Sequence, residues 1–118
     1  MHVGRGGPIL AVQVENEYGS FGSDHEYVGI IRQASIDAGF GESLMYTADP
    51  PAAIMNGSLP DLLAAANFSM GDARAAWALL DRLRPHAPHM IGEYWAGWYD
   101  SLGRALCHDR YCEARERA

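Results

Sequence analysis

Short apolar segments alternate with longer amphipathic segments along most of the chain. The run ILAVQV, from Ile9 to Val14, is apolar and rich in β-branched residues, and Gly-Gly-Pro precedes it. A continuous apolar run of this length predicts a strand buried on both faces, as in a parallel sheet. SLMYT, from Ser43 to Thr47, and HMIGE, from His89 to Glu93, predict two further short strands.

Two amphipathic segments have helical spacing. The first helix is predicted from Asp24 to Ala38, with Ser23 and Glu26 as a capping box at its start and Gly39 as its stop. The second opens at Gly71-Asp72 and ends before the next proline. Their apolar faces consist of Tyr27, Ile30, Ile31 and Ala34 in the first helix and of Ala76, Leu79, Leu80 and Leu83 in the second.

Three segments are harder to assign. LLAAANF, from Leu62 to Phe68, favours a helix by its alanine content but is bounded like a third strand, so both interpretations stay open. Ala52 to Leu59 is assigned to neither class. The aromatic segment YWAGWYD, from Tyr94 to Asp100, is expected to be a loop that follows the strand ending at Glu93.

The alternation of strands and helices predicts the fold class. Repeated βαβ units with right-handed crossovers are typical of an α/β protein with a parallel sheet. Four strands in about 90 residues match the repeat of a (β/α)8 TIM barrel, whose full circuit takes about 250 residues. Residues 1–103 are therefore expected to form a partial TIM-barrel catalytic domain, about half a barrel, and residues 104–118 a divergent charged tail.

Composition excludes several classes of function. The chain has 118 residues, 48% of them hydrophobic, and a formal net charge of −6 with a pI of about 5.2, so it offers no basic surface for nucleic acid. It contains no run of 18 apolar residues and no signal peptide, so no membrane association is predicted. Cys107 and Cys112 give no disulfide framework and favour a reducing, cytoplasmic compartment. With His108 they lack a fourth ligand, so no metal site is predicted.

Two predicted strands lead directly to glutamates. Glu17 ends the first strand and Glu93 ends the fourth. In barrels the reacting groups lie at the carboxyl ends of the strands. A retaining glycosidase needs two such carboxyl groups about 5–5.5 Å apart, one as proton donor and one as nucleophile. A carboxylate that is merely solvated at a strand end is the ordinary alternative for Glu17.

Two longer motifs around these glutamates resemble a known family. GGPILAVQVENEYGS, residues 6–20, resembles the signature of glycoside hydrolase family 35, the β-galactosidases, and IGEYWAGWYDSLG, residues 91–103, resembles that family's nucleophile segment. The resemblance implies Glu17 as general acid/base, Glu93 as nucleophile and Asn16 as the partner of the sugar 2-hydroxyl. It implies no metal or organic cofactor. The tail that begins with LCHDRYC departs from the family pattern.

Aromatic residues next to Glu93 are candidates for sugar binding. Trp95 and Trp98 are predicted to bind substrate, because flat apolar rings suit the C–H face of a sugar. Trp98 stands at the family's more characteristic aromatic position. Tyr94 could contribute in the same way, and ordinary packing is the alternative for all three.

Strand periodicity leaves the choice of glutamate open. Glu15 and Glu17 fall on the same face of a regular strand, so only the resemblance selects Glu17. Glu15 and Gln13 are expected to be structural, facing inward in a hydrogen-bond network. Asn16 would face away from Glu17, so the two can meet one sugar only if the strand bends or bulges. Asp49 precedes Pro-Pro and is expected to form a turn.

The expected function is hydrolysis of terminal, non-reducing β-D-galactose from a galactoside or oligosaccharide substrate. Another exo-β-glycosidase of the same barrel clan, such as an exo-β-glucosaminidase, is one alternative, and an inactive remnant is another. By the family's strand order the chain begins at the fourth strand and ends past the seventh, which suggests truncation. Open sheet edges then predict that it needs the missing strands or self-associates.

Overall fold

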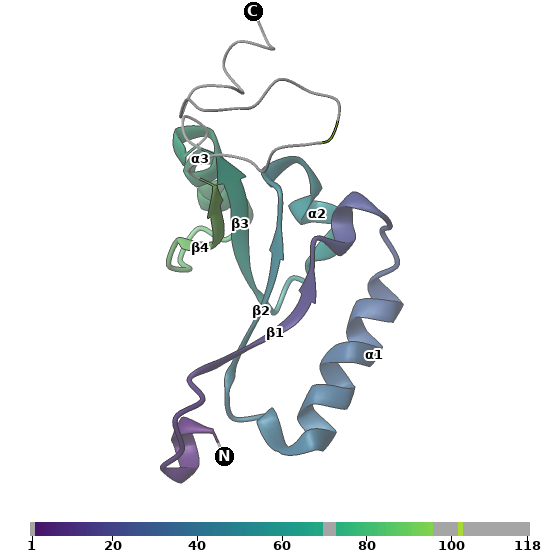
Figure 1. Ribbon diagram of the computed structural model, residues 1–118, viewed down its shortest axis with the longest axis vertical. Helices are drawn as coiled ribbons and strands as arrows, with labels where there is room; N and C mark the ends of the chain where they lie inside the picture. Colours follow the sequence, from purple (N-terminus) through teal and green to yellow (C-terminus); the bar gives the residue numbers. More distant parts are fainter. Residues whose placement is uncertain (1, 70–72, 96–101, 103–118) are drawn as a thin grey trace, which may run out of the picture.

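The computed structural model describes residues 2–69, 73–95 and 102, and it shows one parallel sheet of four strands (Figure 1). The strands are hydrogen-bonded in chain order and every neighbouring pair is parallel. The strands are β1 (Ala11–Asn16), β2 (Leu44–Asp49), β3 (Leu63–Ser69) and β4 (Met90–Trp95).

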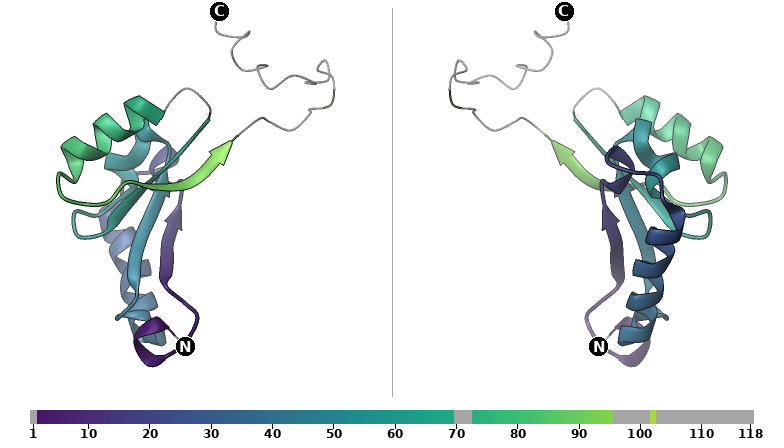
Figure 2. Two further views of the ribbon diagram at one scale, coloured as in Figure 1. Left: turned by 90° about the vertical axis from the view of Figure 1, so that its left-hand side faces the viewer. Right: turned by 90° about the vertical axis from the view of Figure 1, so that its right-hand side faces the viewer.

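Helices cover one side of this sheet, as Figure 2 shows. They are α1 (His25–Ser35), α2 (Ile54–Gly57) and α3 (Ala73–Leu83), with 3₁₀ turns η1 (Val3–Arg5), η2 (Tyr18–Ser20) and η4 (Pro51–Ala53) and the π-helical turn η3 (Ile36–Phe40). A doubly wound sheet would reverse its strand order and carry helices on both faces. The described architecture is therefore that of successive βα units of a (β/α)8 barrel, as predicted. No described helix has the length and apolar character needed to cross a membrane.

The first predicted helix is present, but its cap differs from the prediction. Asp24, not Ser23, is the N-cap, and its Oδ1 accepts from the backbone N–H of Glu26 at 2.9 Å and of Tyr27 at 3.1 Å. One carboxylate thus satisfies two free N–H groups and also places negative charge at the positive end of the helix. Gly39 ends the helical segment with φ 94°, as predicted.

The ambiguous segment before the second long helix is a strand. Ala64, Ala65 and Ala66 of β3 are at most 2% exposed. Burial on both faces and hydrogen bonds to two neighbouring strands outweigh the helical propensity of alanine. The small side chains also let α3 approach closely, so that Phe68 meets Trp77 edge to face at a centroid distance of 5.5 Å.

Two strand predictions need correction. The first strand runs two residues later than predicted and is not buried on both faces, because Val14 is its only buried residue. It has one neighbour, β2, among the described residues, and its other backbone edge is unpaired there. The fourth strand extends to Trp95, so Tyr94 and Trp95 belong to the strand and not to a loop.

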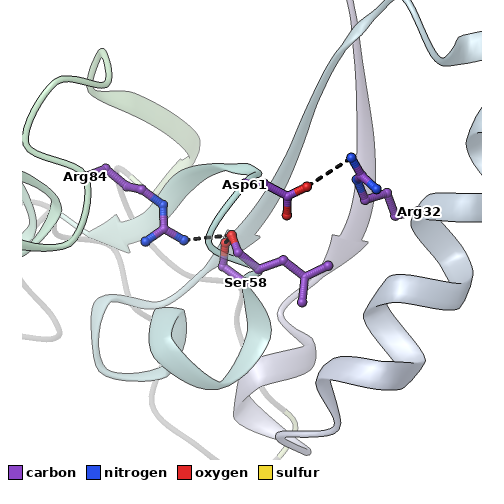
Figure 3. Close-up of polar contacts among 5 residues, drawn as sticks. Arg32, Ser58, Asp61 and Arg84 are labelled. Atoms are coloured by element: carbon purple, nitrogen blue, oxygen red, sulfur yellow. Dashed lines mark hydrogen bonds and ion pairs between the residues drawn. The ribbon is translucent and has the colours of Figure 1, made fainter.

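The helix layer is tied together at the amino ends of the strands, opposite the edge that carries the glutamates. The Arg84 Nη2 donates to the carbonyl of Leu59 at 2.7 Å, and the Ser58 hydroxyl donates to the same oxygen. Figure 3 shows the Arg84 side chain reaching this loop beside Ser58. On the other side of the same loop, Arg32 pairs with Asp61 at 2.9 Å. The loop before β3 is thereby fastened to both α1 and α3.

Candidate active site

A bulge in β1 decides which side chains face which layer. Gln13 is opposite Tyr46, but Glu15 is opposite Thr47, so Val14 is the extra residue in the pairing with β2. As a result Gln13 and Asn16 lie on one face, although three positions apart, and the Gln13 Nε2 donates to the Asn16 Oδ1 at 2.8 Å. The Tyr46 hydroxyl donates to the Gln13 Oε1 at 3.2 Å from the same face.

The bulge puts Glu15 on the helix side. Its Oε1 accepts from the hydroxyl of Tyr27 in α1 at 2.9 Å, and its Oε2 accepts from the backbone N–H of Asn16 at 2.9 Å. The hydrogen bond to Glu15, followed by burial and the Glu15 charge, raises the pKa of Tyr27. The expected structural network is confirmed for Glu15. The expectation that it faces inward, on the same side as Glu17, is wrong.

Glu17 follows β1 in a left-handed conformation, with φ 57° and ψ 20°. It is the one non-glycine residue with positive φ in the part of the chain that the structure describes. Such a conformation costs on the order of 1–3 kcal/mol and persists only where the surroundings hold it. Its backbone N–H donates to the carbonyl of Ala48 at 2.7 Å, which anchors the turn to the end of β2.

Asn67 of β3 connects the two glutamates. Its Nδ2 donates to the Glu17 Oε1 at 3.0 Å, and its register partner on β4 is Glu93. Asn16 pairs with Ala48, and Ala48 with Ala65. Because Asn67 is two residues beyond Ala65, it lies on the same face as Asn16.

This face is turned away from the helices, since the flanking residues Ala66 and Phe68 pack against α3. Asn16 and Glu17 reach this face in two different ways: the bulge at Val14 turns Asn16 to it, and the left-handed conformation of Glu17, which follows the strand, brings its carboxylate to Asn67. The two residues thus share a face through a bend at the strand end, and the bulge lies before both of them. Asn67 was missed by the sequence analysis. Its signal was one amide near the end of an otherwise apolar strand segment.

Around Glu93 the aromatic residues divide between the two faces. The indole Nε1 of Trp95 donates to the Glu93 Oε2 at 2.9 Å, so these two side chains lie together. Tyr94 instead meets Phe68 edge to face at 5.9 Å and belongs to the helix side. Trp98 lies outside the described residues, as do Cys107, His108 and Cys112.

Asp49 ends β2 as a buried carboxylate, not as a turn residue. It is 1% exposed, and its Oδ1 accepts from the backbone N–H of Gly19 at 2.8 Å. A Cβ on either Gly19 or Gly57 would collide with this carboxylate, so both glycines are needed for the fit. Burial raises the pKa of Asp49, and the charges of Glu17 and Glu15 add to this, while the Gly19 N–H opposes it.

The site therefore contains two carboxylates on one face, each held by an uncharged donor, Glu17 by an amide and Glu93 by an indole. Within the described ranges no group of three or more His, Cys, Asp or Glu residues is arranged to hold a metal ion. Such an arrangement is suited to proton transfer by one carboxyl group and nucleophilic attack by the other.

Comparison with known proteins gives consistent matches. The model of the family described as "Glycosyl hydrolases family 35" matches residues 1–117. Among the relatives, a β-galactosidase of Xanthomonas manihotis is 50% identical over 99 residues, which is 84% of this chain and 17% of that protein.

Two mammalian relatives follow. "Beta-galactosidase-1-like protein 3" of Rattus norvegicus is 44% identical over 99 residues, 84% of this chain and 15% of that protein. "Beta-galactosidase-1-like protein 2" of Homo sapiens is 40% identical over 100 residues, 84% of this chain and 16% of that protein. The chain thus spans about one-sixth of the length of these relatives.

Proposed function

Because the chain belongs to family 35 of the glycosyl hydrolases, we propose that the protein carrying it is a retaining β-galactosidase. It releases terminal β-D-galactose by a double displacement with Glu17 as acid/base and Glu93 as nucleophile. The relatives named β-galactosidase support the substrate class. The observation that carries the proposal is the position of both glutamates at the carboxyl edge of one face, on either side of Asn67.

The separation between the two carboxyl groups is the critical geometry. Three strand spacings of about 4.8 Å lie between the backbones of β1 and β4. Curvature of a barrel sheet toward its axis and the length of two glutamate side chains reduce this span on the inner face. A retaining mechanism requires about 5–5.5 Å between the carboxyl groups.

In the first step Glu17 gives its proton to the glycosidic oxygen while Glu93 attacks the anomeric carbon. The bond to the aglycone breaks with its electron pair, and a covalent galactosyl-enzyme forms. Trp95 occupies the Oε2 of Glu93, so the attack is assigned to the Oε1. In the second step the ionised Glu17 takes a proton from water, and the resulting hydroxide releases galactose from Glu93.

The hydrogen bond from Asn67 is compatible with both steps. An amide N–H can donate to a carboxylate and equally to the carbonyl oxygen of a carboxylic acid. The Glu17 Oε1 accepts this bond, which leaves the Oε2 to carry the proton. Asn16, on the same face, is assigned to the sugar 2-hydroxyl, and Trp95 and Trp98 to the apolar face of the ring.

The test uses the full-length protein that carries this sequence, assayed on aryl β-galactosides and on β-glucosaminides. A 2-fluoro-galactoside with a good leaving group should trap the covalent intermediate on Glu93, identified by peptide mass. Glu93→Gln should abolish turnover. Glu17→Gln should lose about 10²–10⁴-fold, with much less loss for an activated aryl leaving group that needs no proton.

Glu15→Gln is the matched control. It makes the same chemical change two residues from Glu17, but on the helix side, so it should lower stability and leave turnover within about twofold. Labelling of another residue, or equal losses in Glu15→Gln and Glu17→Gln, would contradict the assignment. Turnover of glucosaminides alone would select the other exo-glycosidase, and a folded, unlabelled and inactive protein would identify a remnant.

A further inference from the structure

Asn67 is a buried polar side chain that holds Glu17 but takes no part in bond making or breaking in the proposed chemistry. It is 0% exposed, so it cannot reach the substrate directly. Its Nδ2 donates to Glu17, while its Oδ1 is buried and has no hydrogen-bond partner among the residues that the structure describes. A buried acceptor without a partner is unfavourable, and a native structure retains one only where something else requires the group.

The unpartnered Oδ1 lies against the backbone of β4. A Cβ added to Gly92 would stand 2.5 Å from this oxygen and 2.8 Å from the Cβ of Ala48, closer than real Cβ atoms come. Only glycine therefore leaves room for the Asn67 amide in its present position. Gly92 directly precedes Glu93, so one rigid amide contacts Glu17 by a hydrogen bond and the chain that carries Glu93 by packing.

We propose that Asn67 is a positioning residue that sets the placement of Glu17 relative to Glu93. A glycine is required at position 92 because only a residue without a side chain leaves space for the Asn67 amide. The inference rests on the proposed function. An uncharged amide suits this role, because it can donate to Glu17 in both the ionised and the protonated state. A charged donor would instead strongly favour the ionised state. Within the described ranges, the charged side chains that its contacts place near Glu17 include the carboxylates of Asp49 at the end of β2, Glu93 across Asn67 and Glu15 on the other face.

Asn67→Asp tests the electrostatic part, because it keeps the shape of the side chain and replaces the donor by a like charge. Two carboxylates that share a site cannot both ionise easily. The alkaline limb of the kcat profile should therefore move upward by about one pH unit or more. KM should stay within about twofold, since Asn67 does not touch the sugar. Gln33→Glu is the matched control, because it makes the same change from an amide donor to a carboxylate, opposite Asp37 at an exposed position of α1, and it should leave the profile unmoved.

Gly92→Ala tests the steric part without changing charge. It should lower kcat by about 100-fold, the effect of a misplacement of about 1 Å, and leave the pH of the limbs unchanged. In the double variant Gly92→Ala/Asn67→Ala, removal of the amide relieves the clash with the Asn67 Oδ1, while the close contact with the Ala48 Cβ remains. The two losses should then be clearly less than additive.

Fluorosugar labelling of the wild-type protein separates the possible failures. If Glu93 is labelled, but Asn67→Asp leaves the pH profile in place or the two losses are additive, this inference is rejected and the proposed function stands. If the folded wild-type protein neither hydrolyses galactosides nor takes the label, both the proposed function and this inference are rejected. Circular dichroism of each variant shows that a kinetic loss is not a loss of fold.

Discussion

Replacing Asp49 by asparagine removes a buried charge and keeps the shape of the side chain. In the wild-type protein the burial of Asp49 raises its pKa, so the folded state favours the protonated form. The contribution of Asp49 to the free energy of unfolding is then fully present below the ordinary pKa of an aspartic acid. It is lost as the pH rises through the raised pKa of the folded state. Each unit of elevation costs about 1.4 kcal/mol of stability at neutral pH. Asparagine has no such dependence.

The hydrogen bond to Gly19 gives the second magnitude. Asparagine can still offer an oxygen to this N–H, which Asp49 accepts at 2.8 Å. Alanine cannot, and a buried donor left unpaired costs about 1–3 kcal/mol. Asp49→Ala should therefore be less stable than Asp49→Asn at every pH, by about that amount.

Urea unfolding of the full-length protein, followed by tryptophan fluorescence, measures both effects. The free energy of unfolding of Asp49→Asn minus that of the wild type should increase from about pH 4 to about pH 7. The sign of this slope is the test, because a constant difference from the new amide group does not affect it. A wild-type protein that gains stability over Asp49→Asn as the pH rises would refute the account of the buried charge.

Two further predictions separate stability from activity. Gly57→Ala should destabilise by about 1–3 kcal/mol through overpacking against the buried carboxylate of β2, whereas Gly29→Ala, which meets open space in α1, should stabilise by about 0.5–1 kcal/mol; equal effects in thermal unfolding would contradict this. Arg84→Met removes the short hydrogen bond to Leu59 and should lower the free energy of unfolding by about 1.5–3 kcal/mol. Its kcat should be unchanged, because the loop is far from the glutamates. The exposed control Arg82→Met should change the free energy of unfolding by no more than about 0.5 kcal/mol.

The sequence pattern predicted the order and type of the elements better than their ends. Apolar runs located β2 and β4 to within two residues, because a buried strand needs little more than length and hydrophobicity. The pattern could not distinguish a helix from a strand for the alanine segment of β3. Alanine propensity favours a helix, and only pairing with both neighbouring strands makes the segment a strand. The cap of α1 was misplaced by one residue, since Ser23 and Asp24 are both good caps.

The site was less accessible from the sequence, for a different physical reason. Faces of a strand are predicted by counting alternate residues, and this count fails after a bulge. Glu15 and Asn16 consequently exchanged sides relative to the prediction. Asn67 was missed because its meaning depends on Glu17 fifty residues earlier, a contact that no local pattern contains.

The turn at Glu17 and the burial of Asp49 are two parts of one arrangement. A glutamate in the left-handed conformation is unfavourable by itself. The turn η2, which follows Glu17, keeps it in this conformation only if the backbone groups of the turn and of Glu17 have fixed partners. Two such partners come from the end of β2: the carbonyl of Ala48, which accepts from the Glu17 N–H, and the carboxylate of Asp49, which accepts from the Gly19 N–H. The hydrogen bond from the Gly19 N–H to Asp49 thus offsets part of the strain at Glu17, and the burial of Asp49 is the cost of forming it. Any variant that releases the Gly19 N–H should also free Glu17 from Asn67. Stability and the placement of the proposed acid/base are therefore coupled through this loop.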